Sequence, residues 1–167
     1  MKRIIKKPRL LNEHVLDPRT SLGASKEYTR ERMGEGVTCP CCGQFVKIYP
    51  RTIHSTMART LVLAYRKYSK EWFHLSKLTG TSGRGGEESK LRYWGLLEEE
   101  HTRRPDGGRS GWWRITRDGE LFVLGELEIR KYAMVYNGRC VGHEGDWISI
   151  HDALGKRFSL SELMGRD

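Results

Sequence analysis

Apolar side chains recur every three or four residues in one long stretch near the middle of the chain. These positions are Met57, Leu61, Ala64, Tyr65 and Tyr68. This spacing places them on one face of an α-helix. Ser55 or Thr56 can cap the first turn, because a hydroxyl accepts a hydrogen bond from an amide that has no partner within the helix. The pattern predicts a helix from about residue 55 to residues 69–70.

Shorter elements are predicted after this helix. Residues 72–75 are aromatic and strand-like, and residues 76–79 can form one helical turn. Residues 87–94 predict a second helix, and Gly95 stands where such a helix ends. The stretch between these helices therefore indicates a compact arrangement of short elements.

Two strands and a further helix follow. Residues 96–100 and 112–116 predict two strands joined by a polar hairpin, and residues 118–127 predict a helix with a weaker pattern. Trp113 and Ile115 alternate with polar neighbours, so they are expected to face inward while Trp112 is partly exposed. The predicted core consists of Leu61, Leu75, Leu91, Trp94, Leu96, Trp113 and Ile115.

The C-terminal part predicts a β-hairpin. Two apolar runs within residues 132–150 are separated by Asn137-Gly138, a favoured two-residue turn. A second turn is expected at residues 144–146, leading into a strand at 147–150. The last apolar residues can cover an exposed face of the core: Leu154, Phe158, Leu160, Leu163 and Met164.

The N-terminal part lacks clear periodicity. Residues 1–36 predict an extended arm with a short helix around residues 26–33, and residues 37–50 predict a turn followed by a short strand. The fold class expected for the whole chain is α+β. Its predicted segments are a basic arm (1–36), a cysteine knuckle and strand (37–54), a winged-helix domain (55–127) and a β-hairpin extension on the same core (128–167).

Charge is distributed unevenly along the chain. The net charge is +9, and residues 1–70 contribute 15 basic and 5 acidic side chains, a balance of +10, against 15 and 16 in the remainder, a balance of −1. A basic arm of this kind can follow nucleic-acid phosphates, or it can be a solvated tail that only aids solubility. The arm residues expected to contact phosphates are Lys2, Arg3, Lys6, Lys7 and Arg9.

Two stretches resemble parts of a winged helix. Residues 90–98 (Lys-Leu-Arg-Tyr-Trp-Gly-Leu-Leu-Glu) resemble the end of a recognition helix running into the first wing strand. Residues 113–121 (Trp-Arg-Ile-Thr-Arg-Asp-Gly-Glu-Leu) resemble the second wing strand running into the next helix. Together they are similar to winged-helix transcription regulators of the multiple-antibiotic-resistance-regulator type. The resemblance covers about residues 55–125 and implies a winged helix-turn-helix that binds nucleic acid, double-stranded DNA in the first instance.

The resemblance implies which basic side chains would meet the nucleic acid. The wing residues Arg103, Arg104, Arg109 and Arg114 would lie along the backbone, and Arg84, Lys90 and Arg92 would touch the groove or its edge. The chain departs from the family pattern at the start of the helix, where Glu87 and Glu88 oppose the phosphate potential. The charge pattern therefore leaves base-specific reading by this helix open.

Four cysteines suggest a metal site. Cys39-Pro40-Cys41-Cys42-Gly43 resembles a zinc knuckle, in which a tight turn brings two thiolates to one ion. Cys140 and His143 have the same spacing and would complete a structural Cys₃His zinc site with Cys39 and Cys42. Competing ligands are His14, His54 and Cys41, and the alternative is a turn with free thiols and no metal.

Composition narrows the class of protein. Charged residues make up 31%, and no apolar run reaches the ~18 residues that span a bilayer. With no secretory signal, we expect a cytoplasmic protein without a membrane partner or a small-molecule substrate. No general base is spaced as in zinc hydrolases, so no enzyme is expected.

Two functions are open at this point. The first is a nucleic-acid-binding protein, a DNA-binding transcription regulator that uses the arm and the arginine-rich wing. The second is a protein-interaction module whose winged helix docks onto a polymerase or another nucleic-acid machine. The small domain with a cysteine knuckle is also similar in style to phage-encoded proteins of unassigned role.

Overall fold

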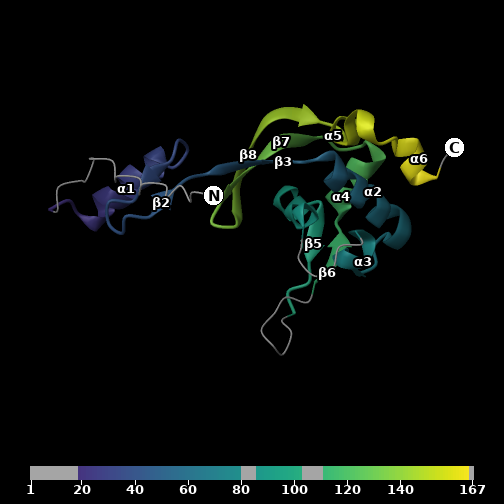
Figure 1. Ribbon diagram of the computed structural model, residues 1–167, viewed down its shortest axis with the longest axis horizontal. Coiled ribbons are helices and arrows are strands. Elements are labelled where there is room, and N and C mark those ends of the chain that lie inside the picture. The colour runs from purple at the N-terminus through teal and green to yellow at the C-terminus, as the bar shows by residue number, and fades with distance from the viewer. Residues whose placement is uncertain (1–18, 80–85, 103–110, 166–167) are drawn as a thin grey trace, which may run out of the picture. The chain divides into compact units, whose positions relative to one another are not determined.

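The computed structural model describes residues 19–79, 86–102 and 111–165, and its elements are labelled in Figure 1. The chain divides into two compact units, Met1–Tyr49 and Pro50–Asp167. Helices alternate with short antiparallel strands along the chain, so the α+β class is confirmed.

The first unit combines one helix with a two-stranded hairpin. Its elements are α1 (Leu22–Arg32), β1 (Val37–Thr38) and β2 (Phe45–Val46). The helix begins earlier than predicted because Ser21 caps it, with the Ala24 amide donating to the Ser21 hydroxyl over 3.2 Å. The short helix predicted around residues 26–33 is therefore present as α1, which starts four residues earlier. The arm residues 1–18 lie outside the described part of the chain.

The second unit contains the remaining elements. In chain order these are β3 (Tyr49–Thr52, starting at the boundary), α2 (Ser55–Tyr68), β4 (Phe73–His74), α3 (Leu75–Thr79), the 3₁₀ helix η1 (Glu87–Trp94), β5 (Leu97–Glu99), β6 (Trp112–Ile115), α4 (Arg117–Leu124), β7 (Ile129–Tyr136), β8 (Arg139–Ile148), α5 (Ile150–Leu154), the 3₁₀ helix η2 (Gly155–Arg157) and α6 (Leu160–Met164). The predicted helix at 55–70, the short strands and the hairpin around Asn137-Gly138 are confirmed.

Two three-stranded antiparallel sheets organise this unit. One has the order β4-β6-β5 and the other the order β3-β7-β8. In the first sheet, Phe73 pairs with Trp113 and Leu97 pairs with Ile115. These four side chains are buried, so one face of the sheet forms part of the core.

Helix α2 lies at the centre of the core. It packs against α4, α5, α6 and η1. Figure 1 shows α5 and α6, which follow β8 in the chain, on the same side of the unit as α2. Every residue of the predicted core is buried: Leu61, Leu75, Leu91, Trp94, Leu96, Trp113 and Ile115. The C-terminal apolar residues also pack here as predicted: Leu154, Phe158, Leu160, Leu163 and Met164.

Two local predictions are corrected. Residues 87–94 form a 3₁₀ helix rather than an α-helix, and its two buried residues, Leu91 and Trp94, are three apart, which suits three residues per turn. The turn expected at 144–146 is absent from the hairpin, where β8 continues to Ile148 through a register shift. A bulge absorbs the extra residue, so no reversal of the chain is needed.

Candidate nucleic-acid interface and cysteine pairs

The sheet β4-β6-β5 presents a polar and aromatic face opposite its buried one. Trp113 and Ile115 are 4% and 3% exposed, whereas Trp112 is 40% exposed and Arg114 is half-buried. The predicted alternation of the two tryptophans is confirmed. We call the side chains gathered on and beside this face the outer-face cluster: Trp72, His74, Glu98, Trp112 and Arg114.

Cross-strand pairs hold the outer-face cluster together. His74 is paired with Trp112, and their rings meet edge to face with centroids 5.8 Å apart. Arg114 is paired with Glu98, with Nε and Nη2 at 2.7 and 2.6 Å from the same carboxylate oxygen. The Arg114 guanidinium also lies 4.7 Å from the centre of the Trp72 ring. The face therefore combines exposed aromatic rings with a planar cation held in place.

Lys90 and Arg92, the two other basic residues of the predicted interface that the structure describes, also have acidic partners. Lys90 Nζ lies 2.5 Å from the Glu87 carboxylate, and Arg92 lies 3.7 Å from the Glu99 carboxylate. The hydrogen bond from Lys90 lowers the pKa of Glu87, so this carboxylate keeps its charge. These cations partly neutralise the glutamates of η1 and β5, which reduces the positive potential offered to a phosphate.

The other predicted contact residues lie outside the described residues. This applies to Lys2, Arg3, Lys6, Lys7, Arg9, Arg84, Arg103, Arg104 and Arg109. In the sequence, the last three belong to the segment that joins β5 to β6. Their role in binding stays a prediction.

The sequence reasoning did not include Trp72, His74 and Glu98 in the interface. The alternation in residues 72–74 was a usable signal, because it places Trp72 and His74 on one side of a strand. Their meeting with Arg114 and Trp112 depends on the register between β4, β6 and β5, which no local pattern specifies.

The first cysteine pair lies in the turn between β1 and β2. The Cys39 amide donates to the Gln44 carbonyl and the Gly43 amide donates to the Cys39 carbonyl, both over 2.8 Å. Hydrogen bonds from the backbone amides of Cys42 and then Cys41 lower the pKa of the Cys39 thiol, and the Cys42 side chain adds to this. Amides directed at one sulfur beside a second thiol suit a thiolate metal ligand pair.

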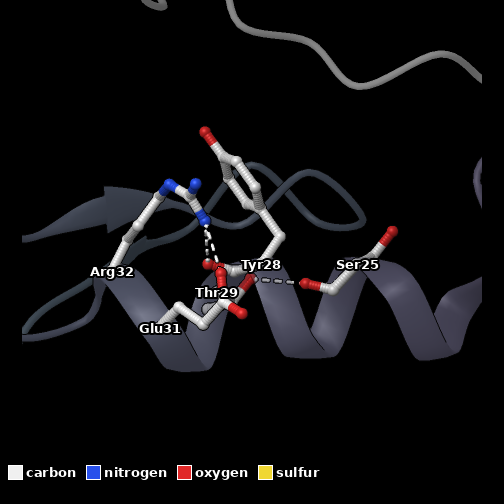
Figure 2. A network of polar contacts seen from close by, with 5 residues as sticks. All are labelled: Ser25, Tyr28, Thr29, Glu31 and Arg32. Atoms are coloured by element: carbon white, nitrogen blue, oxygen red, sulfur yellow. Dashed lines mark hydrogen bonds and ion pairs between the residues drawn. The ribbon is translucent and has the colours of Figure 1, made fainter.

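Helix α1, which precedes this turn in the chain, has a polar network of its own. Figure 2 shows the Thr29 hydroxyl donating to the Ser25 carbonyl over 2.9 Å. The Thr29 side chain makes a small contribution to lowering the pKa of the Cys39 thiol. In the same view, the Arg32 guanidinium lies 4.2 Å from the Tyr28 ring centre and Nη1 is 3.0 Å from the Glu31 carboxylate. These contacts stabilise α1, which packs against β1.

The second pair lies on β8 in the other unit. Cys140 Sγ is 3.5 Å from His143 Nε2, and this nitrogen is 2.8 Å from the Tyr93 carbonyl oxygen. A carbonyl only accepts, so Nε2 carries the proton and Nδ1 has the lone pair that a metal requires. A carbonyl partner on the other nitrogen is common for metal-bound histidines. The Cys140 sulfur contacts the protonated nitrogen of His143 rather than the nitrogen with the lone pair, so the four-ligand set stays a prediction.

No group of three or more metal-ligating side chains occurs among the residues that the structure describes. In the same residues, no helix has both the length and the apolar character needed to cross a bilayer. Comparisons of the chain with protein-family models, with curated proteins and with solved structures find no match.

Proposed function

We propose that this chain is a nucleic-acid-binding protein built on a winged helix. The order α2, β4, α3, η1, β5, β6, α4 agrees with the order that the resemblance implies. β5 and β6 are antiparallel partners, as the two strands of a wing must be. The basic excess of residues 1–70 supplies a charge that attracts phosphates.

The observation that carries the proposal is the outer-face cluster at the base of the proposed wing. Trp72 and Trp112 are 38% and 40% exposed, and both lie beside a cationic or imidazole side chain. Exposed aromatic rings next to arginine are suited to contact bases and sugars, while arginine attracts the backbone. The segment that follows β5 in the sequence adds Arg103, Arg104 and Arg109.

One observation favours the second function, a protein-interaction module. Lys90, Arg92 and Arg114 each have a glutamate partner within 4.0 Å. A face whose charges are already balanced can dock a protein through Trp72 and Trp112, because such contacts need little excess charge. The two functions differ in their dependence on salt.

A titration with nucleic acid distinguishes them. We expect the purified protein to bind fluorescent random-sequence duplex DNA at low salt, with an affinity that falls linearly in a plot of log K against log salt. Fluorescence anisotropy at several salt concentrations measures this slope. Absence of binding at low salt would contradict the proposal and favour a protein partner, as would an affinity that salt does not change.

Two variants of the outer-face cluster should change binding in opposite directions. Trp112→Ala removes a contact ring and should weaken binding about fivefold or more. Glu98→Gln releases Arg114 from its carboxylate and should strengthen binding by about two- to fivefold. Both affinities are read in the same anisotropy titration, and thermal unfolding shows whether each variant is folded. Unchanged affinity in both folded variants would mean that this face does not contact the nucleic acid.

A further inference from the structure

The β7–β8 hairpin carries a second aromatic and cationic pair, Arg130 and Trp147, here called the hairpin platform. The two residues are direct partners across the strands. The Arg130 guanidinium lies 4.2 Å from the centre of the Trp147 ring. Trp147 is 56% exposed, the largest value among the five tryptophans of the chain. The platform therefore offers a large ring to solvent near the C-terminal end of β8.

A β-bulge fixes the arginine of the platform. Tyr132 pairs with Glu144 and Arg130 with Trp147, so β8 has one more residue than β7 in this interval. Arg130 Nη1 donates to the Gly145 carbonyl in the bulge over 2.8 Å. Gly145 has a φ of +86°, and a Cβ there would lie 2.6 Å from the Tyr132 ring. Only glycine allows this bulge, which orients a backbone acceptor toward Arg130.

The platform is also anchored from the core side. The indole nitrogen of Trp94 in η1 donates to the Arg130 carbonyl over 2.8 Å, and Trp94 is buried. The backbone of Arg130 and its guanidinium are thus both held by hydrogen bonds. A ligand that stacks here meets a group that is already ordered, so binding costs little further conformational entropy.

The charges around the platform indicate what kind of ligand it suits. Lys131 and Arg139 on the hairpin are balanced by Glu144 and Asp146 of β8, all exposed or half-buried. This balance gives little attraction for a run of phosphates. The ring of Trp147 and the guanidinium plane of Arg130 remain, and both are surfaces on which nucleic-acid bases stack.

We propose that the hairpin platform binds one unpaired base of a single-stranded nucleic acid by stacking. In a duplex the faces of the bases are covered by their neighbours, so only an unpaired or terminal base can stack on this ring. The inference rests on the proposed function, that the chain binds nucleic acid. It adds a second contact site and the class of ligand, an unpaired base, that this site takes.

The test compares variants on two oligonucleotides by fluorescence anisotropy. Trp147→Ala should weaken binding of a short oligothymidylate about fivefold or more, the loss expected for one base stack. Its affinity for a long, fully paired duplex, in which the faces of nearly all bases are covered, should stay at the wild-type value. Trp147→Phe keeps an aromatic face and should retain most of the single-strand affinity. Near-ultraviolet circular dichroism checks that both variants keep the packed fold.

The outcomes separate this inference from the proposed function. If wild-type protein binds both oligonucleotides and folded Trp147→Ala binds the single strand equally well, the platform has no role and the proposed function stands. If Trp147→Ala weakens both equally, the ring does not select unpaired bases and the inference is overturned. If wild-type protein binds neither oligonucleotide, both the inference and the proposed function are wrong.

Discussion

Replacing Gly119 by alanine is expected to destabilise the second unit by about 3 kcal/mol, because the added methyl group has no space. Gly119 lies in the first turn of α4. A Cβ at this position would overlap the backbone carbonyl oxygen of Leu96 and lie 2.7 Å from Cγ1 of Ile115. A backbone oxygen cannot rotate away as a side chain can. The start of α4 would have to move away from the strand that follows η1.

Such a movement would also break the hydrogen bonds that join α4 to the sheet. The Thr116 hydroxyl accepts from the Gly119 amide over 3.0 Å and donates to the Gly95 carbonyl. The Thr116 amide donates to the Leu96 carbonyl over 3.2 Å. Because one threonine caps the helix and contacts the end of η1, these bonds change together. The cost of the substitution therefore exceeds that of a single steric contact.

Urea unfolding followed by circular dichroism measures the effect. Gly142→Ala is the matched control in the same unit, because a Cβ there has no neighbour within 4 Å and Gly142 has no positive φ. The control should change the free energy of unfolding by about 0.5 kcal/mol or less. Equal stability of the two variants would show that α4 does not approach the Leu96 carbonyl this closely.

Local patterns identified the elements of the second unit well. The spacing of apolar residues in α2, the alternation at Trp113 and Ile115, and the turn at Asn137-Gly138 each depend on a few neighbouring residues. Preferences for helix, strand or turn that depend on neighbouring residues can be predicted from the sequence. The same holds for Gly119, which the winged-helix resemblance included without giving its reason. The structure supplies that reason as a close approach to the chain after η1.

Features that depend on strand register could not be predicted in the same way. The meeting of Glu98 with Arg114 follows from the pairing of β5 with β6. The partnership of Arg130 with Trp147 requires the bulge at Gly145, where the sequence suggested a turn. A glycine between acidic residues fits either outcome, since both use a positive φ. Long-range pairing decides between them.

The excess positive charge and the exposed tryptophans come from different parts of the chain. Residues 71–167 carry a balance of −1, whereas residues 1–70 carry +10. The three exposed tryptophans, Trp72, Trp112 and Trp147, all belong to the second unit. Long-range attraction of a polyanion must therefore come mainly from the N-terminal part, and short-range ring contacts from the second unit. Removing the basic arm should affect the salt slope more than removing a tryptophan does.

One zinc ion per chain is expected in protein purified from zinc-containing medium, and none in the Cys42→Ser variant. The amides that hydrogen-bond to the Cys39 sulfur favour its thiolate, and the Cys42 thiol lies beside it. Serine is a much poorer ligand for zinc than a thiolate, so one substitution should remove the ion. Elemental analysis by mass spectrometry gives the metal content per chain.

Cys41→Ser is the matched control for this loss. Cys41 is exposed and lies in the same turn, but its backbone amide rather than its thiol is directed at Cys39. This variant should therefore keep its zinc. Loss of zinc from Cys41→Ser and its retention in Cys42→Ser would show that the turn uses the other cysteine. Retention in both variants would contradict a metal ion in this turn.

The same measurement tests the second half of the predicted ligand set. Cys140→Ser and His143→Ala should each lose zinc if Cys140 and His143 complete the site, because a structural zinc takes four protein ligands. Replacing zinc by Co²⁺ gives an independent readout, since the intensity of the thiolate-to-metal absorption increases with the number of bound thiolates. Three thiolates are expected from Cys39, Cys42 and Cys140. Zinc loss on changing Cys42 but not Cys140 would refute this set and make His14 or His54 the next ligands to test.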